Sequence, residues 1–103
     1  MKHEIKTHDG LTYIHLSGDI DLSCSERVRL LLIELVSEQP VTIVELSQVT
    51  VIDSSGIASL LDAEKTAKRR GHKFELASPS ARVVRVLELA HLDSYFTIRD
   101  HES

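Results

Sequence analysis

Apolar and polar residues alternate imperfectly in the first part of the chain, a pattern typical of β-strands. The stretch HEIKTHDGLTYIHLSG spans residues 3–18 and has Asp9 and Gly10 near its centre. An Asp-Gly pair is a strong signal for a two-residue hairpin turn. We therefore predict two short strands around this turn, with Gly18 ending the second. The apolar positions of the second strand are Leu11, Tyr13, Ile14 and Leu16.

The apolar period changes to three and four residues in DIDLSCSERVRLLLIELVSEQP, residues 19–40, which predicts a helix. We expect Asp21 or Ser23 to cap its start, and Pro40 lies beyond its end. The predicted inner face consists of Cys24, Val28, Leu31, Leu32 and Leu35.

A short β-branched run, VTIVEL at residues 41–46, predicts a buried central strand that continues through residues 47–52 as a loop or a strand tail. A second helix is predicted to start near Ser54 and to end before Gly71, with the cations Lys68, Arg69 and Arg70 in its last turn. Its predicted core residues include both Leu60 and Leu61. The rest of the inner face is Ile57, Glu64 near the margin, and Ala67 or Lys68.

Another strand is predicted over HKFELA, residues 72–77, with Phe74 and Leu76 on one side. We expect Ser78 to cap a third helix and Pro79 to occupy its first position. Its predicted stripe consists of Val83, Val84, Leu87 and Ala90. Residues 94–98, SYFTI, favour a final edge strand, and the chain is expected to fray from about Asp100.

The predicted order is β-β-α-β-α-β-α-β, which indicates an α/β fold. We expect a four- to five-stranded mixed sheet packed with three main helices. We also expect one domain over residues 1–103, with its core at about residues 4–99, because 103 residues suit one hydrophobic core.

Composition narrows the class of protein. The net charge is −4 and aromatic residues make up 4% of the chain, so neither a basic patch nor a stacking platform for nucleic acid is expected. There is no apolar stretch of about 18 residues, and the N-terminal MKHEIKTHDG lacks the apolar core of a signal peptide. Cys24 is the only cysteine, so an internal disulfide is impossible. These features favour a cytoplasmic protein without direct membrane insertion.

Motifs for enzyme chemistry are missing from the sequence. The six histidines form no His-x-x-x-His pair, and none stands beside Cys24. There is no G-x-S-x-G elbow, P-loop or G-x-G-x-x-G loop. A catalytic triad assembled in space stays open as a minor alternative. We expect no catalysis, no metal and no cofactor.

The stretch VIDSSGIASLL, residues 51–61, carries the most distinctive chemistry. Asp53, Ser54, Ser55 and Gly56 stand between a strand region and a helix. One reading is that a serine hydroxyl caps the helix. The other is that a serine is phosphorylated there, because a helix N-terminus tolerates a phosphate well. Gly56 would leave the spot open to the approach of a partner.

Three segments resemble the STAS domain family, whose founding members are bacterial anti-sigma factor antagonists. The family's D-S-S-G-L-G motif, which follows its third strand, is matched by VIDSSGIASLL. Its G-E-L-D element between the second strand and the first helix is matched by LSGDIDLS, and its C-terminal part by GHKFELASPSARVVRVLELAHLDSYFTI. The resemblance covers about residues 5–98.

This resemblance implies a binding module. In the family, the unphosphorylated domain binds an anti-sigma factor, which is often also a serine protein kinase that phosphorylates the first serine of D-S-S-G. Binding is then lost until a phosphatase resets the switch. That role falls on Ser54, with Asp53 beside it and Asp21 matching the final acid of G-E-L-D. The implied partner-binding residues are Asp21, Asp53, Ser54, Ser55, Gly56, Ile57 and Ala58.

Two residues depart from the family motif, since Ile57 and Ala58 replace its leucine and second glycine. The change at Ala58 points to a different partner. The S-G-I-A-S-L stretch also resembles small STAS proteins that accompany ABC-type lipid transporters and bind the ATPase subunit through the same surface. The sequence therefore leaves two partners open, an anti-sigma factor and a transporter ATPase.

Overall fold

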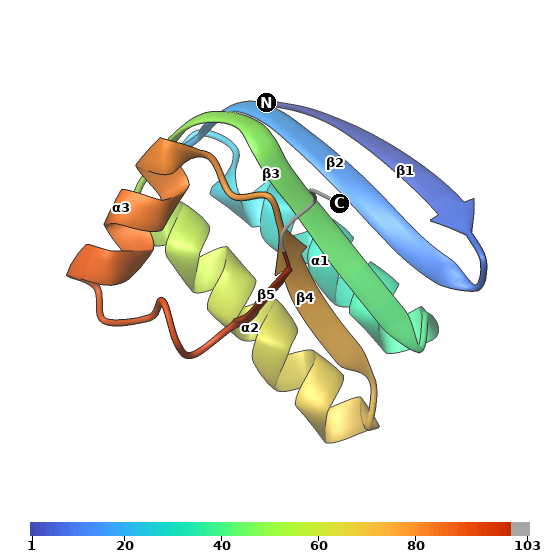
Figure 1. Cartoon of the computed structure of the whole chain (residues 1–103). Helices are drawn as coiled ribbons and strands as arrows, with labels where there is room; N and C mark the ends of the chain where they lie inside the picture. The colour runs from blue at the N-terminus through green and yellow to red at the C-terminus, as the bar shows by residue number, and fades with distance from the viewer. Residues whose placement is uncertain (100–103) are drawn as a thin grey trace.

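Strands and helices alternate along the chain in the predicted order (Figure 1). The computed structural model describes residues 1–99, and the fraying expected from Asp100 falls outside them. The elements are β1 (Lys2–His8), β2 (Leu11–Ile20), α1 (Ser25–Glu38), β3 (Val41–Ile52), α2 (Ser54–Arg70), β4 (Lys73–Ala77), α3 (Ala81–Leu89) and β5 (Thr97–Arg99). The predicted α/β class, with a mixed five-stranded sheet and three helices, is confirmed.

The sheet has the strand order β1-β2-β3-β4-β5. The β1–β2 hairpin is antiparallel, and its turn at Asp9 and Gly10 has φ values of 54° and 77°, as a type I′ turn requires. All other neighbouring strands are parallel, so each must be reached by a crossover, and α1, α2 and α3 provide them. β3 is therefore central, and its residues 42–46 are buried, as predicted.

β2 is longer than predicted, because it does not end at Gly18 but continues to Ile20. β3 runs without interruption to Ile52, so residues 47–52 form a strand tail, which was one of the two predicted alternatives. The pairing of β2 with β3 contains two register shifts, one between His15 and Ser17 and one between Gly18 and Asp19. Gly18 has a φ of 88°, a conformation that glycine adopts easily, and this lets β2 continue through the irregular pairing instead of ending there.

One face of the sheet carries the core. α1 and α2 lie side by side against it, and α3 packs near the carboxyl end of β3 (Figure 1). The fully buried side chains in this layer include Ile14, Leu16, Leu32, Val44, Leu46, Leu60, Leu76 and Leu87. No helix within residues 1–99 covers the opposite face, which presents the alternate set of strand residues (Figure 1).

The inner faces of the helices differ from the predictions at several positions. In α1 the buried apolar residues are Val28, Leu32 and Val36, while Cys24, Leu31 and Leu35 are half-buried at its margins. In α2, Leu60 is buried as predicted, but Leu61 is only half-buried. The inner stripe continues to Ala67 and excludes Lys68, which is exposed.

The predicted start of α3 is wrong. Ser78 is in the left-handed conformation, with φ of 48°, and its N–H donates to the carbonyl of Arg99 at 3.1 Å. The chain therefore turns at Ser78, and the helix begins at Ala81 with Ser80 as its cap. The Ser80 hydroxyl also donates to the carbonyl of Val49 at 2.8 Å, which ties the helix start to β3. Val83 and Leu87 form the buried stripe, whereas Val84 is half-buried and Ala90 is exposed.

Candidate functional site

The start of α2 is capped by Asp53, not by a serine. Asp53 Oδ1 accepts hydrogen bonds from the backbone N–H groups of Ser55 at 3.0 Å and Gly56 at 3.1 Å. The Ser55 hydroxyl donates to the same oxygen at 2.6 Å. Helix starts need such acceptors because their first N–H groups have no partner within the helix. The expectation that a serine hydroxyl serves as the cap is wrong, since the only serine hydroxyl involved acts as a donor.

These contacts lower the pKa of the Asp53 carboxyl from its ordinary value of 3.8. The largest cause is the hydrogen bond from the Ser55 hydroxyl, followed by that from the Gly56 N–H. The backbone N–H groups of Ser55 and Leu22 act in the same direction. Asp53 is therefore a fixed negative charge at the helix start.

Ser54 is the first residue of α2, and it is exposed. Its hydroxyl makes no hydrogen bond with any residue in 1–99, while its neighbours Asp53 and Ser55 are both occupied in the cap. The hydroxyl is consequently accessible, uncommitted and placed at the positive end of the helix dipole. Chemically, this position can accept a phosphoryl group without disrupting the cap.

The loop after β2 repeats the local geometry of the α2 start. Asp21 Oδ1 accepts from the Ser23 N–H at 3.0 Å and from the Ser23 hydroxyl at 2.6 Å. This pair orders the turn but does not cap α1, whose N-cap residue is Cys24 with no side-chain hydrogen bond. The capping role expected for Asp21 or Ser23 is therefore wrong, because their hydrogen bonds stabilise the turn that precedes α1 and do not reach the first N–H groups of the helix.

The two Asp-x-Ser turns lie next to each other. The Asp53 N–H donates to the carbonyl of Ile20 at 3.2 Å, which joins the end of β2 to the start of α2. A third acid, Asp19, accepts a hydrogen bond from the Thr50 hydroxyl at 2.7 Å. Asp21, Asp53 and Ser54 therefore lie at the same end of the sheet, and Asp19 makes this end more acidic.

Gly56 serves close packing inside the domain. It is buried, and a Cβ atom at this position would lie 2.7 Å from Ile52 Cγ1 and 2.9 Å from Ile20 Cγ2. No real Cβ contact is that short, so α2 can approach the ends of β2 and β3 this closely only with glycine. The expectation that Gly56 leaves room for a partner is wrong, because the room is taken by two isoleucines of the core.

An apolar hollow of about 340 Å³ lies directly beside Ser54. Its lining is formed by Ser54, Ile57, Ala58 and Leu61 of α2 and by Val86, Leu89 and Ala90 of α3. Leu89 is 69% exposed, so the apolar surface of the hollow continues onto the outer side of α3. The hollow explains why Leu61 is only half-buried, since its side chain lines a surface instead of filling the core.

Sequence reasoning missed the contribution of α3 to this region. The available signal was the L-x-L spacing of Leu87 and Leu89, because only one of two leucines two residues apart can face the core of a helix. Leu22, between Asp21 and Ser23, is a further exposed leucine at this end of the sheet, with 78% of its surface accessible.

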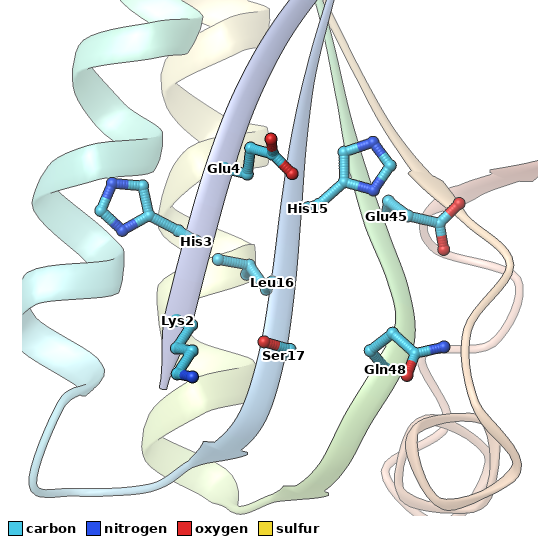
Figure 2. Close-up of a pocket in the computed structure, with 8 residues that line it drawn as sticks. All are labelled: Lys2, His3, Glu4, His15, Leu16, Ser17, Glu45 and Gln48. Carbon is cyan, nitrogen blue, oxygen red and sulfur yellow. The ribbon is translucent and has the colours of Figure 1, made fainter.

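A second hollow, of about 570 Å³, lies over β1, β2 and β3 and is lined mainly by polar side chains (Figure 2). Glu4, His15 and Glu45 stand opposite one another on these three strands. Among residues 1–99 no group of three or more histidine, cysteine, aspartate or glutamate side chains is arranged to hold a metal ion.

Within the part of the chain that the structure describes, no helix combines the length and apolar composition needed to cross a bilayer.

The chain is similar to known proteins in both sequence and fold. The anti-sigma F factor antagonist of Paenibacillus polymyxa is 26% identical over 101 residues, covering 96% of this chain and 86% of that protein. An anti-sigma factor antagonist from Mycobacterium paratuberculosis has a TM-score of 0.84 at 21% identity, over 95% of this chain and 84% of that one. The Bacillus cell fate determinant SpoIIAA in its phosphorylated form has a TM-score of 0.75 at 17% identity, over 99% of this chain and 93% of that one. A family model described as the STAS domain matches residues 2–103, and the chain therefore belongs to the STAS domain family.

Proposed function

We propose that this chain is a non-catalytic regulatory module that antagonises an anti-sigma factor and is switched by phosphorylation of Ser54. The observation that carries the proposal is the environment of Ser54. Its hydroxyl is exposed and free of any role in the cap, and it borders the apolar hollow between α2 and α3. The similarity to a curated anti-sigma F factor antagonist supports the choice of partner.

The unmodified surface suits a protein partner. Its centre is apolar, formed by Ile57, Ala58 and Leu61 together with α3. Asp53 precedes Ser54, which lines the hollow, and Asp21 lies at the same end of the sheet, so charge is available beside the apolar centre. An apolar centre with a charged rim is the usual composition of a protein interface. Among the residues implied by the family, Ser54 and Ala58 are exposed and can make direct contacts, Ile57 lines the hollow, and Gly56 supports them from within.

Phosphorylation would change this surface without unfolding it. The kinase transfers the γ-phosphoryl group of ATP to Ser54 Oγ, the hydroxyl proton is lost, and ADP leaves. The phosphate adds a charge of about −1.5 to −2 at pH 7, which the N-terminus of α2 tolerates. A partner that covers the hollow must then strip water from this charge next to Asp53, so binding is lost. A phosphatase restores binding by hydrolysing the ester.

The alternative partner is the ATPase subunit of an ABC-type lipid transporter. Ala58 favours it, because a side chain now stands at an exposed position where the antagonist motif has glycine. This reading uses the same hollow but does not require modification of Ser54.

Affinity capture from the native organism separates the two readings. A tagged chain and its Ser54→Asp variant are used as baits, and captured proteins and phosphosites are identified by mass spectrometry. The proposal predicts that the wild-type chain captures an ATP-binding anti-sigma factor, that the variant captures less of it, and that a fraction of the bait carries phosphate on Ser54. Equal capture of a transporter ATPase and its permease by both baits, with Ser54 unmodified, would contradict it.

A further inference from the structure

β1 leaves one edge of the sheet open. It is the first strand in the sheet order, and among residues 1–99 it pairs only with β2 (Figure 1). All seven of its residues are exposed, including Ile5, whose side chain is 44% exposed. An exposed edge strand presents unpaired N–H and C=O groups, which makes it a template for pairing with another strand.

The hairpin turn determines which backbone groups point outward. In a two-residue hairpin with a type I′ turn, the flanking residues His8 and Leu11 form a hydrogen-bonded pair. Because such pairs alternate along antiparallel strands, the even-numbered residues of β1 bond to β2. The N–H and C=O groups directed at the open edge therefore belong to His3, Ile5 and Thr7.

We infer that β1 pairs antiparallel with β1 of a second copy of this chain, with the two-fold axis at Ile5. In this register His3 of each copy forms a hydrogen-bonded pair with Thr7 of the other, and the two Ile5 residues form the central pair. Glu4 of each copy then stands opposite Lys6 of the other, in the closely spaced positions that favour side-chain contact. The sequence KHEIKTH is thus complementary to itself in charge.

The charged side chains of Glu4 and Lys6 are available to pair with a second copy of the chain. Neither Glu4 nor Lys6 forms an ion pair with a residue in 1–99. Both side chains lie on the helix-free face of the sheet, because Glu4 and Lys6 stand opposite His15 and Tyr13. Ile5 is opposite the buried Ile14 on the other face, so pairing would extend the apolar layer by two isoleucine side chains.

Charge also excludes the neighbouring registers. If the two-fold axis lay at Glu4, the Glu4 residues of the two copies would face each other, and Lys2 of each copy would face Lys6 of the other. If the axis lay at Lys6, the two Lys6 residues would face each other. Like charges directly opposite each other destabilise a pair of strands. Lysines on an edge usually prevent association. Here they would restrict it to a single register, in which all seven residues of β1 find partners.

A pair of seven-residue strands buries little surface, so the dimer is expected to be weak and dependent on concentration. Sedimentation velocity between about 10 µM and 1 mM should show a shift from monomer towards dimer. Glu4→Lys and Lys6→Glu should each weaken association by about tenfold or more, because attraction becomes repulsion at two pairs. Circular dichroism checks that these exposed substitutions leave the fold intact.

Rescue by charge exchange makes the test specific. The double variant Glu4→Lys/Lys6→Glu restores both ion pairs and should dimerise like the wild type. An equimolar mixture of the two single variants should form a heterodimer, because one strand then carries only lysines and the other only glutamates at these positions. A wild type that stays monomeric at 1 mM, or single variants that dimerise as well as the wild type, would overturn the inference.

Disulfide trapping locates the two-fold axis. In a Cys24→Ser background, Ile5→Cys places two thiols at a pair of Cα atoms about 5.5 Å apart, within the range that a disulfide spans. Thr7→Cys is the matched control, because the two copies of residue 7 lie about 14 Å apart in this register. Oxidation should crosslink the Ile5 variant at least tenfold faster than the Thr7 variant. Equal rates would overturn the proposed register.

Discussion

Ser55 Oγ donates a 2.6 Å hydrogen bond to Asp53 Oδ1, and this contact closes the start of α2 without using Ser54. Two of the three polar residues at the helix start are thus committed to local structure, and the third is left at the surface. The reading of D-S-S-G as a mere capping sequence accounts for Asp53 and Ser55. It leaves Ser54 without a structural role, which is the physical basis for assigning it a regulatory one.

The division of roles predicts different stabilities for two alanine variants. Asp53→Ala removes the acceptor of three hydrogen bonds and should lower the melting temperature clearly. Ser54→Ala removes an exposed hydroxyl with no partner in residues 1–99, so its free energy of unfolding should stay within about 0.5 kcal/mol of wild type. Thermal melts of the three proteins test this. A larger loss in Ser54→Ala than in Asp53→Ala would mean that the cap is misassigned.

The cap should also be sensitive to acid. Folding lowers the pKa of Asp53 below 3.8, so its contribution is present above that pH and is lost as the pH falls through the folded pKa. Asp53→Asn keeps a capping oxygen but not the charge. The stability difference between wild type and Asp53→Asn should therefore be largest above about pH 5 and should shrink below about pH 4. Urea denaturation across this pH range provides the measurement. A stability difference between wild type and Asp53→Asn that does not change with pH would contradict the role of the Asp53 charge in the cap.

Leu60 and Leu61 should differ strongly although they are neighbours. Leu60 is 1% exposed in the core, and its replacement by alanine should cost about 2–5 kcal/mol. Leu61 lines the surface hollow, so its replacement should cost roughly half as much or less. Chemical denaturation of both variants gives the comparison. Equal losses would mean that Leu61 belongs to the core.

The apolar hollow should matter for the partner more than for the fold. Leu89→Glu introduces a charge at the margin of the hollow and should weaken binding of the captured partner by about tenfold or more. Leu30→Glu is the matched control, because Leu30 is 55% exposed on α1 and does not line the hollow. Both variants should remain folded by circular dichroism. Comparable affinities of the two variants would place the docking surface elsewhere.

Local signals in the sequence predicted the elements that depend on local chemistry. Asp9 and Gly10 specify the hairpin turn, and Gly71 adopts the left-handed conformation that ends α2. The start of α3 depends instead on a contact between Ser78 and Arg99, which are far apart in the sequence. Helical propensity alone carries no information about such a contact, so Ser78 looked as good a cap as Ser80.

The candidate site could also be predicted only in part, because local residue types mark its position but long-range contacts decide its geometry. Asp53, Ser54 and Ser55 can all cap a helix, and only the backbone geometry at Asp53 selects the aspartate. The burial of Gly56 depends on Ile20, which arrives from another strand. The hollow beside Ser54 requires the placement of α3, and no periodicity within α2 reveals it. Residue types thus marked the position of the site, while its surface depended on tertiary packing.

Titration calorimetry of the purified partner against wild type, Ser54→Ala, Ser54→Asp and the phosphorylated chain tests the central claim most directly. Ser94→Asp is the control for added charge, because Ser94 is exposed in the segment between α3 and β5 and does not line the hollow. We predict that Ser54→Ala and Ser94→Asp bind like the wild type. Ser54→Asp should bind about tenfold more weakly or worse, and the phosphorylated chain more weakly still. Wild-type affinity in both the Ser54→Asp variant and the phosphorylated chain would contradict the account.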